Sequence, residues 1–158
     1  MFARASDIGV AMNPLERLQA LFAWLGRFPL PVLQFAFRFG IASVFWHSGM
    51  TKLANWDTTI ALFRDEYMVP VLPPQIAAAM AATVELTCPV LLVLGLASRL
   101  ATLPMLGMTF VIEVFVYPEQ WIEHLIWATI LVFILTRGPG PLSLDHLIAR
   151  RLAGRKGM

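Results

Sequence analysis

Apolar segments as long as a bilayer crossing dominate this sequence. A helix rises about 1.5 Å per residue, so a hydrocarbon core of roughly 30 Å takes about 20 residues to cross. Apolar windows of this size occupy residues 29–52, 73–97, 99–117 and 121–137. They predict an all-α membrane protein in which residues 29–137 form a four-transmembrane-helix bundle. The second and third windows are joined almost directly, which favours a tight antiparallel hairpin.

The composition fits a lipid environment and excludes several classes of function. Charged residues make up 14% of the chain, against about 25% in an average soluble domain. The formal net charge of +2 is too small to indicate a nucleic-acid partner. Cys88 is the single cysteine, so an internal disulfide is excluded. The sequence contains no nucleotide-binding loop, serine triad or zinc-hydrolase motif, and no cleaved targeting peptide is expected within residues 1–28.

Residues 1–28 are predicted to be an amphipathic N-terminal segment on the cytoplasmic side. Asn13 suits a helix cap, and Pro14 suits the first helical turn after it. Apolar residues then recur every three or four positions, while Glu16 and Arg17 fall elsewhere on the helical wheel. The helix therefore either lies along the membrane interface or packs on the bundle. The recurring residues are Leu15, Leu18, Leu21, Phe22, Leu25 and Phe28.

Lysine and arginine in the flanks predict the orientation, because these residues, and not the net charge, keep a flank in the cytoplasm. Nine of them fall on one side of the predicted spans, whereas Lys52 and Arg64 fall on the other. We therefore expect both termini in the cytoplasm, residues 138–158 as a basic cytoplasmic tail, and residues 53–72 as an outer loop or short helix. The nine are Arg4, Arg17, Arg27, Arg99, Arg137, Arg150, Arg151, Arg155 and Lys156.

Charged residues also lie within the predicted spans, where each costs at least about 2.5 kcal/mol unless it is paired or hydrated. Counted along the helix from the cytoplasmic end, Arg38 lies roughly 14 Å deep and Glu85 roughly 18 Å deep. The two are predicted to form an intramembrane ion pair that locks the bundle, or else part of a proton path or head-group site. A third charge, Glu113, lies roughly 21 Å deep on the third span.

A second group of polar side chains gathers toward the outer half of the bundle. His47 and His124 share a level there, and Lys52 and Glu113 lie close to it. A quinone head group would find donors in His and Lys, a proton partner in a carboxylate and a stacking surface in Trp. The group is therefore a candidate quinone site, although its histidines would serve equally in hydrogen bonds to neighbouring carbonyls. Its members are His47, Lys52, Glu113, His124, Trp46 and Trp127.

No metal site is predicted, although soft ligands occur. His47 and Met50 share a helix face, and sulfur with imidazole would suit copper. However, no CxxC or HxxxH cluster occurs, and methionine is a common gap-filler in apolar helices. No redox cofactor motif is present either, so a quinone is the candidate cofactor and catalytic residues are not assigned. The other soft ligands are Met105, Met108, Cys88 and His124.

Several short motifs resemble the DoxX family of small four-helix membrane proteins. They are Arg38-Phe39-Gly40, residues 48–53, Glu85 followed by residues 95–99, and residues 138–145. The last of these, a glycine-proline turn leading into Leu-Ser-Leu-Asp, is the most specific. The recurrent polar positions of the family correspond here to Arg38, Lys52, Glu85 and Arg99.

This resemblance implies a multi-pass protein of the bacterial inner membrane. The family is named for a subunit associated with a terminal quinol oxidase and with thiosulfate:quinone oxidoreduction. It therefore implies a subunit or accessory protein of a quinone-linked membrane oxidoreductase system, with electrons supplied by a bound quinone or a partner chain. The expected partners are the lipid bilayer and either other membrane subunits or further copies of the chain.

Two alternatives stay open beside this reading. The first is a non-catalytic scaffold or assembly factor for a larger membrane complex, which would bind through closely approaching helices. The second is a small-solute or copper-handling membrane protein, in which Glu85 would line the path. Small residues that allow close helix approach are Ala36, Gly40, Ala78 and Ala82.

Overall fold

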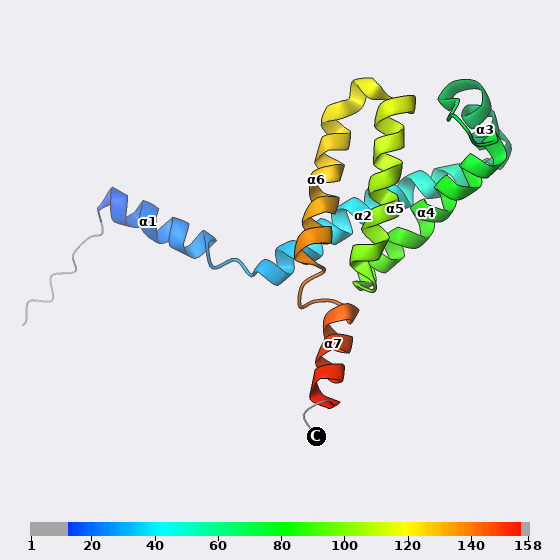
Figure 1. Ribbon diagram of the computed structural model, residues 1–158. Helices are drawn as coiled ribbons and strands as arrows, with labels where there is room; N and C mark the ends of the chain where they lie inside the picture. Colours follow the sequence, from blue (N-terminus) through cyan, green and yellow to red (C-terminus); the bar gives the residue numbers. More distant parts are fainter. Residues whose placement is uncertain (1–12, 156–158) are drawn as a thin grey trace, which may run out of the picture. The chain divides into compact units, whose positions relative to one another are not determined.

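The computed structural model describes residues 13–155 of the chain (Figure 1). Arg4 and Lys156, which contribute to the predicted basic side, lie outside the described residues. The described residues fall into two compact units that divide after Leu30. Every regular element in this part of the chain is helical, which confirms the all-α prediction.

The first unit contains helix α1 (Pro14–Leu25). Its cap is a reciprocal pair, in which the Asn13 side chain accepts from the Glu16 amide at 2.8 Å and the Glu16 carboxylate accepts from the Asn13 amide at 2.9 Å. These bonds satisfy amides that a helix start leaves free, and Pro14 has no amide to satisfy. The predicted cap and start of this helix are confirmed. All side chains of α1 are exposed, including its apolar stripe.

The second unit is built on long helices that follow the four predicted windows. The turn between α4 and α5 consists of residues 95–97, and Gly95 ends α4 in the left-handed region with φ 68°. α5 packs against both α4 and α6 (Figure 1). The long helices are α2 (Leu30–Ala54), α4 (Pro74–Leu94), α5 (Ser98–Val111) with its π-helical continuation η2 (Ile112–Val116), and α6 (Trp121–Arg137).

Short helical elements connect the long ones. Helix α3 (Trp56–Leu62) and the π-helical turn η1 (Phe63–Tyr67) follow α2, so the segment predicted as an outer loop or short helix is helical over most of its length. Asn55 caps α3 by accepting from the Thr58 amide at 3.0 Å. The 3₁₀ turn η3 (Pro118–Gln120) joins η2 to α6.

Length and hydropathy identify candidate membrane spans in α4 and in Ser98–Val116, which is α5 with η2. A third candidate arises when α1 and α2 are counted together as one interrupted span. α6 has the same bounds as its predicted window, but it contains 17 residues and is the shortest of the long segments.

The core of the second unit lies where α2, α4, α5 and α6 meet. Ile41 from α2, Leu92 from α4, Met105 from α5 and Leu131 from α6 are at most 1% exposed and belong to one apolar cluster. Between helices in lipid, such contacts stabilise mainly through close packing.

Arg38 is fully buried at one end of this bundle and bonds to the backbone. Its guanidinium donates to the Leu92 carbonyl at 2.8 Å, to the Val93 carbonyl at 3.2 Å and to the Leu142 carbonyl. The last turn of a helix leaves its carbonyls without partners, so this cation satisfies the end of α4. Arg38 does not form the predicted ion pair with Glu85.

The helix register explains why that pair does not form. The position of a Cβ on Gly49 would lie 3.0 Å from the Glu85 Cβ, which sets Gly49 at the level of Glu85. Arg38 precedes Gly49 by eleven residues, or roughly 16 Å along α2. Depth counted from the apolar window ends placed the two side chains at similar levels, because it assumed that both helices start flush with the membrane.

Residues beyond α6 fold back onto the α4–α5 hairpin. The Asp145 carboxylate accepts from the amides of Ala97 at 2.8 Å and Ser98 at 3.1 Å, which are free because α5 starts there. The Asp145 amide donates to the Gly95 carbonyl at 2.9 Å. We call Arg38, Gly95, Leu142, Ser143 and Asp145 the end cluster. The end cluster joins the first motif, Arg38-Phe39-Gly40, to the last one, residues 138–145.

The region predicted as a basic tail contains a further helix, α7 (Leu144–Arg155). Its start is fixed by Ser143, whose hydroxyl accepts from the His146 amide at 3.2 Å. Apolar length does not indicate this helix, because charged residues interrupt its apolar positions.

Candidate functional site

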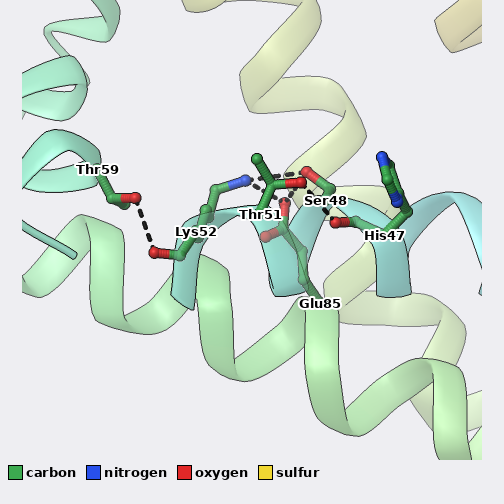
Figure 2. A network of polar contacts seen from close by, with 6 residues as sticks. All are labelled: His47, Ser48, Thr51, Lys52, Thr59 and Glu85. Atoms are coloured by element: carbon green, nitrogen blue, oxygen red, sulfur yellow. Dashed lines mark hydrogen bonds and ion pairs between the residues drawn. The ribbon is translucent and has the colours of Figure 1, made fainter. Parts of the chain in front are cut away.

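A buried polar network joins the end of α2 to the middle of α4 (Figure 2). The Lys52 ammonium lies 2.8 Å from the Glu85 Oε1 and donates to the Ser48 Oγ at 3.0 Å. The Ser48 hydroxyl donates to the same Glu85 oxygen at 3.0 Å. Ser48 and Lys52 are one helical turn apart, so both side chains face Glu85 from the same side of α2.

A glycine and a threonine allow this network to form. Gly49 lets α4 approach α2, because even a methyl group there would meet the Leu86 side chain at 2.9 Å. The Thr59 hydroxyl on α3 donates to the Lys52 carbonyl at 2.9 Å and ties the end of α2 in place. The ion pair is therefore held by helix packing on one side and by the α2–α3 connection on the other.

Glu85 carries one oxygen that the protein leaves without a partner. The side chain is 3% exposed, yet its Oε2 has no hydrogen-bond partner within residues 13–155. An unsatisfied buried acceptor costs roughly 1–3 kcal/mol or more, so such a group needs an explanation. A donor supplied by a bound molecule would provide one.

The Lys52–Glu85 pair lies in the wall of a cavity of about 500 Å³. Small-molecule sites in proteins have volumes of roughly 300–1,000 Å³ and are mostly apolar with a few polar groups. This cavity has that character, since α2, η1, α4, α5 and α6 line it mainly with apolar side chains. The polar and aromatic residues that define its chemistry are Ser48, Lys52, Glu85, Glu123, His124 and Trp127.

His124 contributes a second buried polar pair. Its Nδ1 lies 2.6 Å from the Glu113 Oε2, and its ring meets Trp127 edge-on with 5.1 Å between centroids. His124 is 3% exposed, whereas the Glu113 side chain is 32% exposed. Glu113 lies on η2, a π-helical turn, and such distortions are frequent at functional sites.

The segment after α3 forms part of the cavity wall. Phe63, Tyr67, Val69 and Leu72 all line the cavity. Tyr67 contacts Tyr117 edge-on at 5.8 Å, next to the start of α6. The Tyr117 hydroxyl donates to the Glu66 carboxylate at 2.8 Å, so this segment is tied to the far end of η2.

Of the predicted site residues, Lys52, His124 and Trp127 line the cavity, and Glu113 bonds to His124. Trp46 and His47 do not line it and lie on an exposed face of α2. Figure 2 shows the His47 ring turned away from the Lys52–Glu85 pair. At about 100° per residue, the five residues from His47 to Lys52 turn the helix by roughly 140°, so the two side chains face different sides.

Sequence reasoning missed two members of the network. It assigned Glu85 to the pair with Arg38 and did not consider Ser48. The i, i+4 spacing of Ser48 and Lys52 opposite a lone carboxylate was the signal that could have found both. Within the described residues, no group of three His, Cys, Asp or Glu side chains lies close enough to hold a metal ion.

Comparison with known proteins gives one match. The model of the family described as DoxX matches residues 33–118, which is somewhat over half of the chain. The matched range includes Arg38, Lys52, Glu85 and Glu113, whereas His124 and Asp145 lie beyond it. No curated protein and no solved structure matches the chain.

Proposed function

The chain belongs to the DoxX family of membrane proteins, and on this premise we propose that it is a subunit or accessory protein of a quinone-linked membrane oxidoreductase system. The observation that carries the proposal is the free Oε2 of Glu85 in the wall of the cavity. The cavity would hold a quinone or quinol head group, and the isoprenoid tail would lie in lipid.

The residues present fit such a group. Lys52 is a cationic donor suited to a quinone carbonyl oxygen, and the Oε2 of Glu85 is an acceptor suited to a quinol hydroxyl. Trp127 lines the same cavity and offers an aromatic surface. A bound quinone would supply the two-electron chemistry. The side chains themselves bind the head group, orient it and hold its protons.

Because Oε2 is the proposed acceptor, Glu85→Gln is expected to weaken binding of a short-chain quinol by roughly 10- to 100-fold, as hydrogen bonds to charged groups contribute about 1.5–3 kcal/mol. The full chain would be purified in mild detergent. Co-purified quinone would be quantified in the lipid extract, and quinol binding would be measured by titration. Glu119→Gln is the matched control, because Glu119 is exposed and does not line the cavity.

The proposal fails if the wild-type protein carries no quinone and binds none on titration. It also fails if Glu85→Gln and Glu119→Gln bind quinol with the affinity of the wild type. A non-catalytic scaffold would carry and bind no quinone. Burial then limits which of its small residues could contact a partner protein. Ala78 and Ala82 are at most 5% exposed inside the unit, whereas Ala36 and Gly40 lie on an exposed face of α2.

We further propose that α2, α4, α5 with η2, and α6 each cross the membrane, with both termini in the cytoplasm of a bacterial cell. The antiparallel arrangement supports this topology. The end cluster brings together the first half of α2, the end of α4, the start of α5 and the segment after α6. Arg99 and Arg137 lie near these ends, whereas α3 follows the opposite end of α2.

The topology predicts opposite labelling of two exposed positions. In a Cys88→Ser background, Asp57→Cys on α3 should react with a membrane-impermeant maleimide in intact cells. Arg150→Cys on α7 should react only after the membrane is opened. Arg99→Cys and Glu119→Cys extend the test to the hairpin, and should behave like Arg150→Cys and Asp57→Cys respectively. Labelling of Arg150→Cys in intact cells would exclude the proposed orientation.

A further inference from the structure

We infer that His124 and Glu113 form a proton relay that connects the cavity to a second hollow, which His124 also lines. The inference rests on the proposed function, because a quinol in the cavity is the proton source that it names. The relay itself is carried by the geometry of these two side chains.

The two hollows meet at one residue. The second hollow has a volume of about 390 Å³ and is lined by side chains of α5, η2 and α6, among them Glu113 and Trp121. His124 is the one described residue that lines both this hollow and the cavity, and Glu113 lines the second hollow alone. A proton that passes from the cavity through His124 to Glu113 therefore reaches the second hollow.

The hydrogen bond between the two side chains suits proton transfer. At 2.6 Å, the contact between His124 Nδ1 and Glu113 Oε2 is at the short end of protein hydrogen bonds. An ionised Glu113 can only accept, so Nδ1 then carries the proton and Nε2 is the free acceptor. Nε2 has no hydrogen-bond partner in the described part of the protein, which leaves it open to a hydroxyl in the cavity.

The proton balance is simple. A quinol hydroxyl gives a proton to His124 Nε2, and the proton on Nδ1 moves to Glu113. Glu113, whose side chain is partly exposed three residues before the end of η2, would then release the proton to water at that end of the helix. Rotation of the imidazole ring then resets His124 for the next proton. The proton step leaves a quinolate in the cavity and moves no electron along this path. The two electrons of the quinol would pass to a metal-containing redox centre of a partner chain.

Other titratable groups share the cavity wall and must be separated from the relay. They come from the other elements that line the cavity, of which α5 contributes none, and replacing them would test general electrostatics instead of the direct bond. They are Lys52 from α2, Tyr67 from η1, Glu85 from α4, Tyr117 at the end of η2, and Glu123 from α6. Only Glu113 bonds to the imidazole among the described residues.

Trp127 makes the relay measurable without any quinone. Its ring lies edge-on to His124, and a protonated imidazole quenches the fluorescence of a neighbouring indole. The experiment is a rapid pH jump on the full chain in lipid nanodiscs. The Trp127 signal is isolated by subtracting the Trp127→Phe protein, and the slope of the rate against proton concentration reports how fast His124 is protonated.

Glu113→Gln is expected to reduce that slope by roughly a hundredfold, because a positioned proton-transfer group contributes roughly 10²–10⁴-fold. Glu119→Gln, which removes an exposed charge outside both hollows, should keep the wild-type slope. Glu113→Asp shortens the side chain by one methylene and should give an intermediate slope, which also covers the case in which Glu113→Gln does not fold. A wild-type slope in both Glu113 variants would overturn the relay.

Quinol titration of the same proteins keeps the two proposals apart. Glu113→Gln should bind quinol with nearly wild-type affinity, since Glu113 does not line the cavity. If the wild type binds no quinol but its pH-jump slope falls in Glu113→Gln, the proposed function fails and the relay stands. If quinol binds and the slope is unchanged, the relay alone fails.

Discussion

Gly95→Ala is expected to lower the free energy of unfolding by about 2–5 kcal/mol, the sum of left-handed strain and overpacking. Gly95 has φ +68°, and a Cβ there would lie 2.5 Å from the Arg38 Nη1 and 2.8 Å from the Ser143 Cα. The methyl group would push apart the end cluster, in which Arg38 and Asp145 each make several backbone hydrogen bonds. Loss of helical signal on titration with a denaturing detergent measures the change.

Gly40→Ala is the matched control for this prediction. A Cβ on Gly40, in the middle of α2, would meet no atom within 4 Å. Alanine is favoured over glycine within a helix by roughly 1 kcal/mol, so this variant should be as stable as the wild type or slightly more so. Equal stability of Gly95→Ala and Gly40→Ala would show that the end cluster does not hold the hairpin as described.

Lys52→Met is expected to destabilise the protein by about 3–5 kcal/mol, because removal of one partner leaves a buried charge uncompensated. The Glu85 carboxylate is 3% exposed and would keep only the hydrogen bond from Ser48. The 17% exposure of the Lys52 side chain places the expected value toward the lower end of that range, since water reaches the pair from this side.

The double variant Lys52→Met/Glu85→Gln separates loss of the pair from loss of packing. With neither charge present, its stability should return to within about 1–2 kcal/mol of the wild type, because neutral replacements of a buried ion pair are often tolerated. The detergent titration used for Gly95→Ala gives the four free energies of this cycle. A double variant as unstable as the sum of the two single variants would show that the charges do not interact.

Hydrophobic length alone predicted the four long helical segments of the second unit. The window at 121–137 has the same bounds as α6, and the other windows differ from their helices by a few residues at each end. Local chemistry also predicted the start of α1, where Asn13 and Pro14 act within one turn. These features depend on residues close together in the chain, so the sequence contains the whole cause.

The candidate site could be predicted only in part. It depends on the direction in which each side chain points around its helix, as well as on its depth along the helix. Depth along a helix follows from residue number, and Lys52, His124 and Trp127, which it placed at similar levels, line one cavity. Direction around the helix separates His47 from Lys52, although they are five residues apart. Depth placed Glu113 and His124 at nearby levels. Their 2.6 Å contact, however, depends on the turn that runs from η2 through η3 to α6.

The sequence by itself determined that apolar helices follow one another along residues 30–137 and that several charges lie within them, because helix length and hydropathy are local properties. Only the tertiary structure decided which charge meets which partner. Arg38 satisfies the end of α4, and Lys52 pairs with Glu85, because the close approach at Gly49 sets how far α2 slides along α4. Sliding one helix along another does not change the stability of either helix by itself. Only the packing between the two helices can therefore fix their relative position.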